Sequence, residues 1–204
     1  LTRSSAASDV YKRQTTDQSK EAIFNILANR YDLNEIKVLD LFSGTGSMSF
    51  EFSSRGVKTV YSVDKSYNSI KFIKKFSEEN NLNINVLRKD ILKSNLETNI
   101  KFDIIFTDPP YTNNIKYYTD LLSILRKKLS ISNGSLLILE HPELINLKEQ
   151  EDVIETRKYG SCFFSFLPTE VPTNFSNLLS PRLATSLKAF SKLFEDSLTE
   201  VVLL

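Results

Sequence analysis

The most constraining feature of this chain is the alternation of short apolar runs with segments whose apolar residues recur at helical spacing. Five apolar runs succeed one another, at residues 36–42, 59–63, 84–87, 102–107 and 135–142. Helical spacing marks the segments before and between them, at residues 15–31, 48–56, 67–80 and 115–129. Because the runs are apolar on both faces, they predict a parallel sheet that helices cover on two sides.

A different pattern follows the fifth run. Residues 153–159 alternate in polarity, turn at Gly160 and return as an apolar stretch at 161–166, which predicts a terminal hairpin. The predicted fold is therefore α/β, a doubly wound and mostly parallel sheet of seven strands with an antiparallel C-terminal hairpin.

The two ends of the chain depart from this alternation. Residues 1–14 are dominated by small polar residues, and two prolines, Pro168 and Pro172, interrupt the pattern after the hairpin. We therefore expect one domain at residues 15–167, a non-native or disordered arm at 1–14 and a separate tail at 168–204.

The composition excludes several classes of protein. The single cysteine, Cys162, cannot form an internal disulfide, and the absence of paired Cys/His spacing removes a structural zinc site, so we expect no metal. A net charge of +1 does not require a polyanionic partner. No apolar run approaches the ~20 residues that span a bilayer, and the first residues lack the apolar core of a signal peptide. We therefore expect a cytoplasmic protein that does not associate with membranes.

Carboxylates mark the ends of four successive apolar runs. Asp40 lies in the first run, close to the glycine loop that follows it, while Asp64, Asp90 and Asp108 follow the next three runs. In a doubly wound sheet the carboxyl ends of the strands border the crevice in which ligands bind. Four like charges around one crevice would repel each other, so a ligand that donates hydrogen bonds to them explains the pattern better.

The loop after the first run contains Ser43, Gly44 and Gly46. Two glycines can serve only to turn the chain and let the following helix pack against the strand. A dinucleotide-binding fingerprint would have a third glycine near Ser49, and its absence disfavours a nicotinamide cofactor. Asp64, one strand-helix-strand unit downstream, suits the two hydroxyls of a ribose, although a carboxylate at a strand end also caps a following helix.

The tetrapeptide Asp108-Pro109-Pro110-Tyr111 directly follows the fourth run. It presents a carboxylate, rigid backbone carbonyls and an aromatic ring together, although a plain turn with Asp108 capping its own backbone would use the same residues. The exocyclic amine of a nucleobase is a poor nucleophile because its lone pair is delocalised into the ring. Asp108 and the Pro109 carbonyl can each accept an N–H of such an amine while Tyr111 stacks on the base. These four residues are therefore candidate catalytic residues.

Two of these segments resemble motifs of a known family. Residues 38–46, Val-Leu-Asp-Leu-Phe-Ser-Gly-Thr-Gly, resemble the first motif of class I S-adenosylmethionine-dependent methyltransferases, and residues 108–111 resemble their amino-methylating motif. Residues 15–27, Glu140-His141-Pro142 and residues 157–160 are similar to the RsmD family of bacterial methyltransferases. That family modifies the 2-amino group of a guanine in 16S ribosomal RNA.

This resemblance covers about residues 15–166 and implies a Rossmann-like methyltransferase domain that uses S-adenosyl-L-methionine. The backbone of residues 43–46 would approach the methionine end of the cofactor, Asp64 would hold the ribose and Asp90 would lie near the adenine amine. The segment before the first helix would close over the cofactor. The candidate cofactor-binding residues are Thr15, Thr16, Asp40, Ser43, Gly44, Gly46, Asp64 and Asp90.

The resemblance also implies a monomeric protein whose partner is 16S ribosomal RNA or a small-subunit assembly particle. Gln14 stands where the family usually has proline, and a serine-rich arm replaces a glycine- and lysine-rich hairpin. The basic groups at residues 71–75 and 126–128 would be phosphate contacts or simply solvated faces. The sole histidine, His141, fits a hydrogen-bonded strand end, or a base or phosphate contact, better than a general base.

Two alternatives share some of these features. A DNA amino-methyltransferase, acting on adenine or cytosine, would use the same Asp-Pro-Pro-Tyr chemistry, but such enzymes need a region that flips and reads the base, and no insertion large enough is present. A non-catalytic RNA-binding assembly factor could retain the fold, although the intact Asp108 and glycine loop argue against it. The leading hypothesis is a methyltransferase for the 2-amino group of a guanine in 16S ribosomal RNA.

Overall fold

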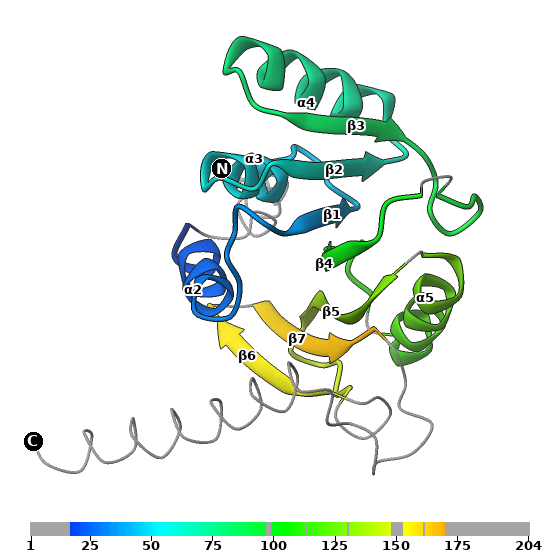
Figure 1. Ribbon diagram of the computed structural model, residues 1–204. Coiled ribbons are helices and arrows are strands. Elements are labelled where there is room, and N and C mark those ends of the chain that lie inside the picture. Colours follow the sequence, from blue (N-terminus) through cyan, green and yellow to red (C-terminus); the bar gives the residue numbers. More distant parts are fainter. Residues whose placement is uncertain are drawn as a thin grey trace, which may run out of the picture.

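The computed structural model describes residues 17–96, 99–112, 114–129, 131–147, 153–160 and 162–169. A seven-stranded sheet runs through them in the order β3-β2-β1-β4-β5-β7-β6 (Figure 1). Its strands are β1 (Lys37–Leu41), β2 (Thr59–Asp64), β3 (Ile84–Arg88), β4 (Phe102–Thr107), β5 (Ile131–Pro142), β6 (Glu155–Tyr159) and β7 (Cys162–Pro168). The first five pair in parallel, and β7 is antiparallel to β5 and β6. The predicted mostly parallel sheet with a C-terminal hairpin is confirmed.

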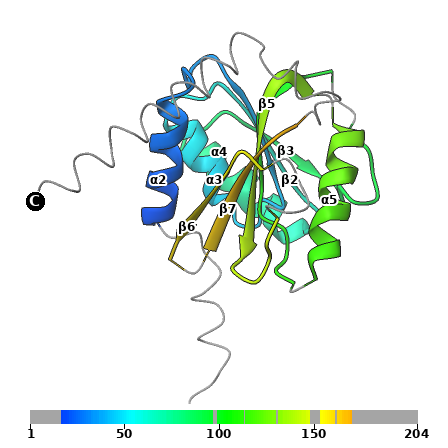
Figure 2. The ribbon, with the colours of Figure 1, turned by 90° about the horizontal axis from the view of Figure 1, so that it is seen from below.

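Helices cover both faces of this sheet, as Figures 1 and 2 show. On one face lie α2 (Asp17–Ala28), α3 (Ser47–Ser54) and α4 (Tyr67–Glu79), and on the other lies α5 (Ile115–Lys128). Polar residues begin α4 and α5, because the side chains of Ser66 and Asn114 accept hydrogen bonds from backbone N–H groups of the first turn. None of the described helices is long and apolar enough to span a bilayer.

The core consists of two apolar layers, one on each side of the sheet. The layer under α2 and α3 includes Ile23, Phe24, Leu27, Phe52, Val38, Val60, Ile104 and Phe166. The layer under α5 includes Tyr118, Leu121, Leu122, Leu125, Leu39, Leu41, Ile105 and Leu137. Residues of both layers alternate along β1 and β5, as expected for strands that are buried on both faces.

The connection between β3 and β4 covers the α5 face without forming a helix in its described part. Ile91 and Leu96 bury their side chains in the α5 layer. The ammonium group of Lys128, at the end of α5, donates to the carbonyls of Ile91, Leu92 and Ser94 at 2.9–3.4 Å. Lys128 therefore holds this connection in place. The sequence suggested a phosphate contact or a solvated face for the basic group at 126–128, and Lys128 has neither role.

Two strand boundaries differ from the prediction. β5 begins at Ile131 rather than at Ser135, because its backbone already pairs with Phe102, before a register shift near Ile104. β7 continues to Pro168, which pairs with Leu136 at the very end of the strand. The pairing continues past this proline, because the Thr169 N–H donates to the Ser135 carbonyl at 3.3 Å.

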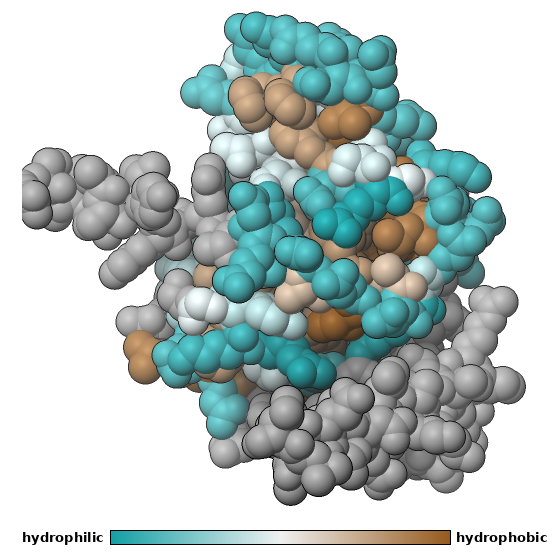
Figure 3. All heavy atoms as spheres, turned by 90° about the vertical axis from the view of Figure 1, so that its left-hand side faces the viewer, coloured by the Kyte–Doolittle hydropathy of each residue, from teal (hydrophilic) through white to brown (hydrophobic). Residues whose placement is uncertain are grey.

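The outer surface of α4 is mixed in character. Lys71, Lys74 and Lys75 are exposed on it, while Phe72 is 49% exposed and packs near Phe50 and Phe76. Figure 3 views the molecule from the left-hand side of Figure 1 and shows a mainly hydrophilic face, with apolar surface gathered below its upper rim.

Candidate functional site

The glycine loop after β1 is tied to the end of β2. The hydroxyl of Ser43 lies 2.8 Å from the carbonyl oxygen of Asp40 and 3.1 Å from that of Val63. The same hydroxyl accepts the backbone N–H of Val63 at 2.9 Å, and the Ser43 N–H donates to the Val63 carbonyl. Ser43, predicted to contact the cofactor, therefore also joins the ends of β1 and β2.

Gly46 begins α3 in a conformation that favours glycine. Its φ is +79°, in the left-handed region, and a Cβ atom placed on it would lie 2.7 Å from Cγ1 of Ile73 on α4. A contact of that length requires the neighbouring side chain to move. Gly46 thus lets the first turn of α3 approach α4 closely.

The carboxylate of Asp40 points beneath α3. It accepts the backbone N–H of Ser49 at 3.1 Å and the Ser49 hydroxyl at 2.5 Å, and only 2% of Asp40 is exposed. Burial raises the pKa of the Asp40 carboxyl to about 7, against the lowering effect of the two hydrogen bonds from Ser49. The side chain of Asp40 therefore holds the first turn of α3 from below.

The carboxylate of Asp64 connects the end of β2 to two neighbouring segments. Oδ2 accepts the backbone N–H of Gly44 at 2.9 Å, and Oδ1 accepts that of Ser66 at 2.7 Å. The sequence left a ribose contact and a capping role open, and the structure shows that Asp64 caps the turn before α4. Each oxygen retains a second lone pair for a ligand.

Asp90 follows β3 and shapes the next turn. Its Oδ1 accepts the Leu92 N–H at 3.2 Å, and its carbonyl accepts the N–H groups of Lys93 and Ser94. The side chain is only partly buried. Asp90 therefore lies at the same edge of the sheet as Asp64, one strand further out.

The Asp108-Pro109-Pro110-Tyr111 loop follows β4 and is held at three points. The Asp108 N–H donates to the carbonyl of Leu41 at 3.4 Å, which places the start of the loop against the end of β1. The hydroxyl of Tyr111 donates to Oε1 of Glu140 at 2.5 Å. At the end of the loop the hydroxyl of the buried Tyr118 accepts the Thr112 N–H at 3.4 Å. Pro109 is buried, whereas Pro110 and Tyr111 are exposed.

The predicted residues that the structure describes meet at the carboxyl edge of the sheet, where the strand order reverses between β1 and β4. The glycine loop, Asp64 and Asp108 lie on neighbouring strands there, with Asp90 beyond them. Thr15 and Thr16 lie outside the described residues. Among the described residues, no group of three or more His, Cys, Asp and Glu side chains could hold a metal ion.

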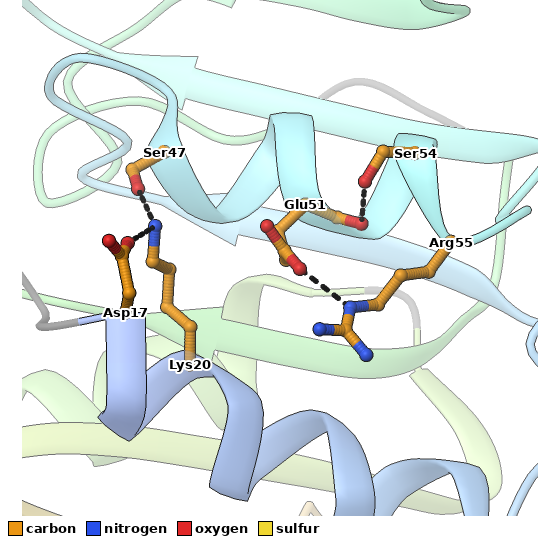
Figure 4. Close-up of polar contacts among 6 residues, drawn as sticks. All are labelled: Asp17, Lys20, Ser47, Glu51, Ser54 and Arg55. Carbon is orange, nitrogen blue, oxygen red and sulfur yellow. Dashed lines mark hydrogen bonds and ion pairs between the residues drawn. The ribbon is translucent and has the colours of Figure 1, made fainter.

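The start of α2 lies beside the start of α3. Lys20 donates to the Ser47 hydroxyl at 3.2 Å and pairs with Asp17 at 2.8 Å (Figure 4). The ammonium group thus stands next to the positive end of the α3 dipole, an unfavourable place for a cation, and the Asp17 carboxylate offsets part of this repulsion. The sequence patterns did not single out Lys20, because its position depends on how α2 packs against α3.

His141 is fully enclosed on the α5 face. Only 1% of it is exposed, and its Nε2 lies 2.8 Å from the hydroxyl of Ser165 on β7. Burial lowers the pKa of His141 below its ordinary value. The structure agrees with the hydrogen-bonded strand end and leaves no surface of His141 for a base or a phosphate.

Comparisons with known proteins identify what this arrangement resembles. A family model described as conserved hypothetical protein 95 matches residues 5–167. The chain is 28% identical over 135 residues to ribosomal RNA small subunit methyltransferase D of Buchnera aphidicola, covering 66% of this chain and 67% of that protein. It is 34% identical over 135 residues to the protein of the same name from Haemophilus influenzae, covering 63% and 67%.

The fold also matches solved structures. One is the T. thermophilus 16S rRNA N2 G1207 methyltransferase RsmC in complex with AdoMet and guanosine, with a TM-score of 0.61 over 78% of this chain and 45% of that chain. At 19% identity, this likeness shows the fold alone.

Proposed function

The chain belongs to the conserved hypothetical protein 95 family of class I S-adenosylmethionine-dependent methyltransferases, and from that premise we propose that it methylates the exocyclic 2-amino group of a guanine in 16S ribosomal RNA. The observation that carries the proposal is the contact between the Asp108 N–H and the Leu41 carbonyl. It holds the Asp-Pro-Pro-Tyr loop against the strand that delivers the glycine loop. An amine acceptor and a methyl donor would then bind side by side.

The residues around the glycine loop fit S-adenosyl-L-methionine. Asp64 retains lone pairs for the ribose hydroxyls, and Asp90 lies one strand further out, where the adenine amine would be. Lys20 and the positive end of α3 together attract the carboxylate of the methionine portion. Bound there, the cofactor supplies an electrophilic methyl group on a cationic sulfonium.

The four candidate catalytic residues hold the amine. Asp108 and the Pro109 carbonyl accept its two N–H groups, so that the nitrogen lone pair is directed at the methyl group. Tyr111 stacks on the base, and the two prolines keep the loop rigid. Orientation of this kind can supply roughly 7–11 kcal/mol of the barrier. The amine would lose a proton to Asp108 or to water as the new C–N bond forms and the S–CH₃ bond breaks, with S-adenosylhomocysteine as the leaving group.

Other predicted residues position the cofactor site without contacting the cofactor. We assign to Asp40 and Ser43 the positioning of α3 and of the glycine loop, because their side chains contact protein groups. Thr15 and Thr16 would close over the cofactor ahead of α2. We also propose that residues 15–167 form the methyltransferase domain, with 1–14 and 168–204 outside it. The family match ends at residue 167, which supports the second boundary, whereas it begins at residue 5, within the proposed arm.

Methyl transfer from labelled cofactor into three acceptors tests the proposal: naked 16S ribosomal RNA, 30S particles and DNA. We expect label in RNA or particles, at the 2-amino group of guanine by nucleoside analysis. Asp108→Ala should lower the rate roughly 100-fold or more while S-adenosylhomocysteine still binds. Asp120→Ala is the matched control, because Asp120 is an exposed aspartate on α5 that pairs with Lys116.

Each alternative has its own outcome in this experiment. Label that enters DNA alone would show a DNA amino-methyltransferase. Binding of RNA and cofactor without transfer would show a non-catalytic assembly factor.

A further inference from the structure

Tyr111 combines an exposed ring with an enclosed hydroxyl. The residue is 41% exposed, yet its hydroxyl donates to Oε1 of Glu140 at 2.5 Å. The Sγ atom of Cys162 lies 3.1 Å from the Tyr111 hydroxyl oxygen. The ring therefore has one fixed end, at the hydroxyl, and a surface that a ligand can reach.

Glu140 is an unusual residue for its position. It lies in β5 after four buried apolar residues, Leu136 to Leu139, and only 3% of it is exposed. A buried carboxylate is costly unless hydrogen-bond donors surround it. The Tyr111 hydroxyl supplies such a donor, which links the burial of Glu140 to the orientation of the exposed ring.

The strand register makes this contact possible. Thr107, at the end of β4, lies opposite Leu139 of β5. Glu140 is therefore one residue beyond the last pair between β4 and β5. The Asp108-Pro109-Pro110 segment carries the chain away from the end of β4, and the Tyr111 side chain reaches back to β5, the neighbouring strand. The hydrogen bond between Tyr111 and Glu140 thus connects the loop that leaves β4 after Thr107 to the end of the neighbouring strand β5.

We propose that Glu140 is a positioning residue for the acceptor base: its carboxylate holds the Tyr111 hydroxyl and so fixes the ring that stacks on the base, an inference that rests on the proposed function. A free surface tyrosine would lose rotamer freedom when the base binds, and a ring held in advance avoids that loss. Burial and the neighbouring Glu140 carboxylate raise the pKa of Tyr111 above its ordinary value. The phenol therefore remains a donor at neutral pH.

His141 shows that this role belongs to Glu140 and not to the whole strand end. Successive residues of a strand point to opposite faces. His141 meets Ser165 and lies near Tyr118 on the α5 face, whereas Glu140 contacts Tyr111, whose hydroxyl also lies near Cys162.

One experiment examines the hydrogen bond in the free protein. With tyrosine labelled by carbon-13 at Cζ, the resonance of Tyr111 is the one that disappears in Tyr111→Phe. Glu140→Leu removes the acceptor from an otherwise apolar strand, and Glu140→Gln keeps an oxygen that can accept. We expect the Tyr111 resonance to move in Glu140→Leu and to move less in Glu140→Gln. A resonance unmoved by Glu140→Leu would overturn the inference, whatever the substrate.

A double-mutant cycle on methyl transfer into a 16S ribosomal RNA transcript examines the role in catalysis. We expect Tyr111→Phe and Glu140→Leu each to lower kcat/KM about tenfold, and the double variant to lose no more than about twofold beyond Tyr111→Phe alone. Glu140→Gln should recover part of the loss. Tyr31→Phe and Glu143→Ala are the controls. Tyr31 packs against the α2 layer, and Glu143 is exposed and pairs with Lys158.

Failure of this inference differs from failure of the proposed function. A wild type that transfers no methyl group to RNA in any form would overturn the proposed function. Transfer by the wild type with losses that multiply to about a hundredfold in the double variant would overturn the positioning role, because Glu140 would then act independently of Tyr111.

Discussion

The carboxylate of Asp64, at the end of β2, accepts the backbone N–H of Gly44 at 2.9 Å. A side chain predicted to bind a ribose therefore also fixes the loop predicted to approach the other end of the cofactor. The two halves of the candidate cofactor site are coupled by this hydrogen bond.

We predict that Asp64→Ala weakens S-adenosylhomocysteine binding at least about tenfold, because the variant loses both the ribose acceptor and the tie to the loop. The free energy of unfolding should fall by only about 1 kcal/mol, since the two freed N–H groups lie in a partly exposed region. Calorimetry and urea denaturation measure the two effects. Asp32→Ala is the matched control, because the Asp32 carboxylate also accepts a backbone N–H, from Asn34, in an exposed turn. Unchanged binding in Asp64→Ala would contradict the ribose assignment.

Gly46→Ala should destabilise the protein by about 1–3 kcal/mol more than Gly160→Ala. Both glycines have a positive φ, so the backbone strain of alanine applies to both. A Cβ atom on Gly46 would lie 2.7 Å from Ile73 Cγ1, whereas one on Gly160 would have no atom within 4 Å. Urea denaturation of the two variants isolates the free-energy cost of this contact. Equal losses in the free energy of unfolding would show that Ile73 on α4 moves aside at no measurable cost.

Asp40 should make stability depend on pH. Its pKa is raised to about 7 in the folded protein, mainly by burial, from an ordinary value of 3.8. The folded state then binds a proton that the unfolded state releases, so the stabilising contribution is fully present below about pH 4 and is lost as the pH rises to about 7.

The measurement compares Asp40→Asn with the wild type by urea denaturation between pH 4 and 8. Asparagine keeps an acceptor for Ser49 and has no charge to bury. The stability of the variant relative to the wild type should therefore improve by a few kcal/mol as the pH rises through that range. A difference that is constant with pH would exclude titration of Asp40 as its cause.

Lys128→Met should loosen the connection after β3. Its ammonium group donates to three carbonyls there, and methionine keeps most of the side-chain volume without a donor. We expect a loss of about 1–3 kcal/mol in the free energy of unfolding and faster amide hydrogen exchange at residues 91–96. Lys127→Met is the control, because Lys127 is the residue before Lys128 on α5 and its side chain is exposed. Equal exchange in both variants would refute this role of Lys128.

Much of the fold was predictable because it follows from local patterns. Apolar runs such as Phe102–Thr107 are buried on both faces, and the alternation with helical segments requires parallel pairing. The start of β5 was missed because Ile131 pairs through its backbone with Phe102, and backbone pairing leaves no trace in the side-chain pattern of one strand.

The candidate site was predictable in part. The residues after β1, β2, β3 and β4 were expected at one edge of the sheet, and the described ones lie there. Their individual contacts were not predictable. The carboxylate of Asp40 faces Ser49 beneath α3. From its place near the end of the first apolar run, the sequence predicted that Asp40 would border the crevice.

The sequence by itself determined the type of fold, the family and the tetrapeptide that would hold an amine, because these depend on periodicity and on chemical groups close together in the chain. Only the tertiary structure decided which distant groups support them. Glu140 reaches Tyr111, and Lys128 reaches the Ile91 carbonyl, across separations of 29 and 37 residues. Contacts of this kind depend on strand register and helix packing, which arise only when the whole sheet is assembled.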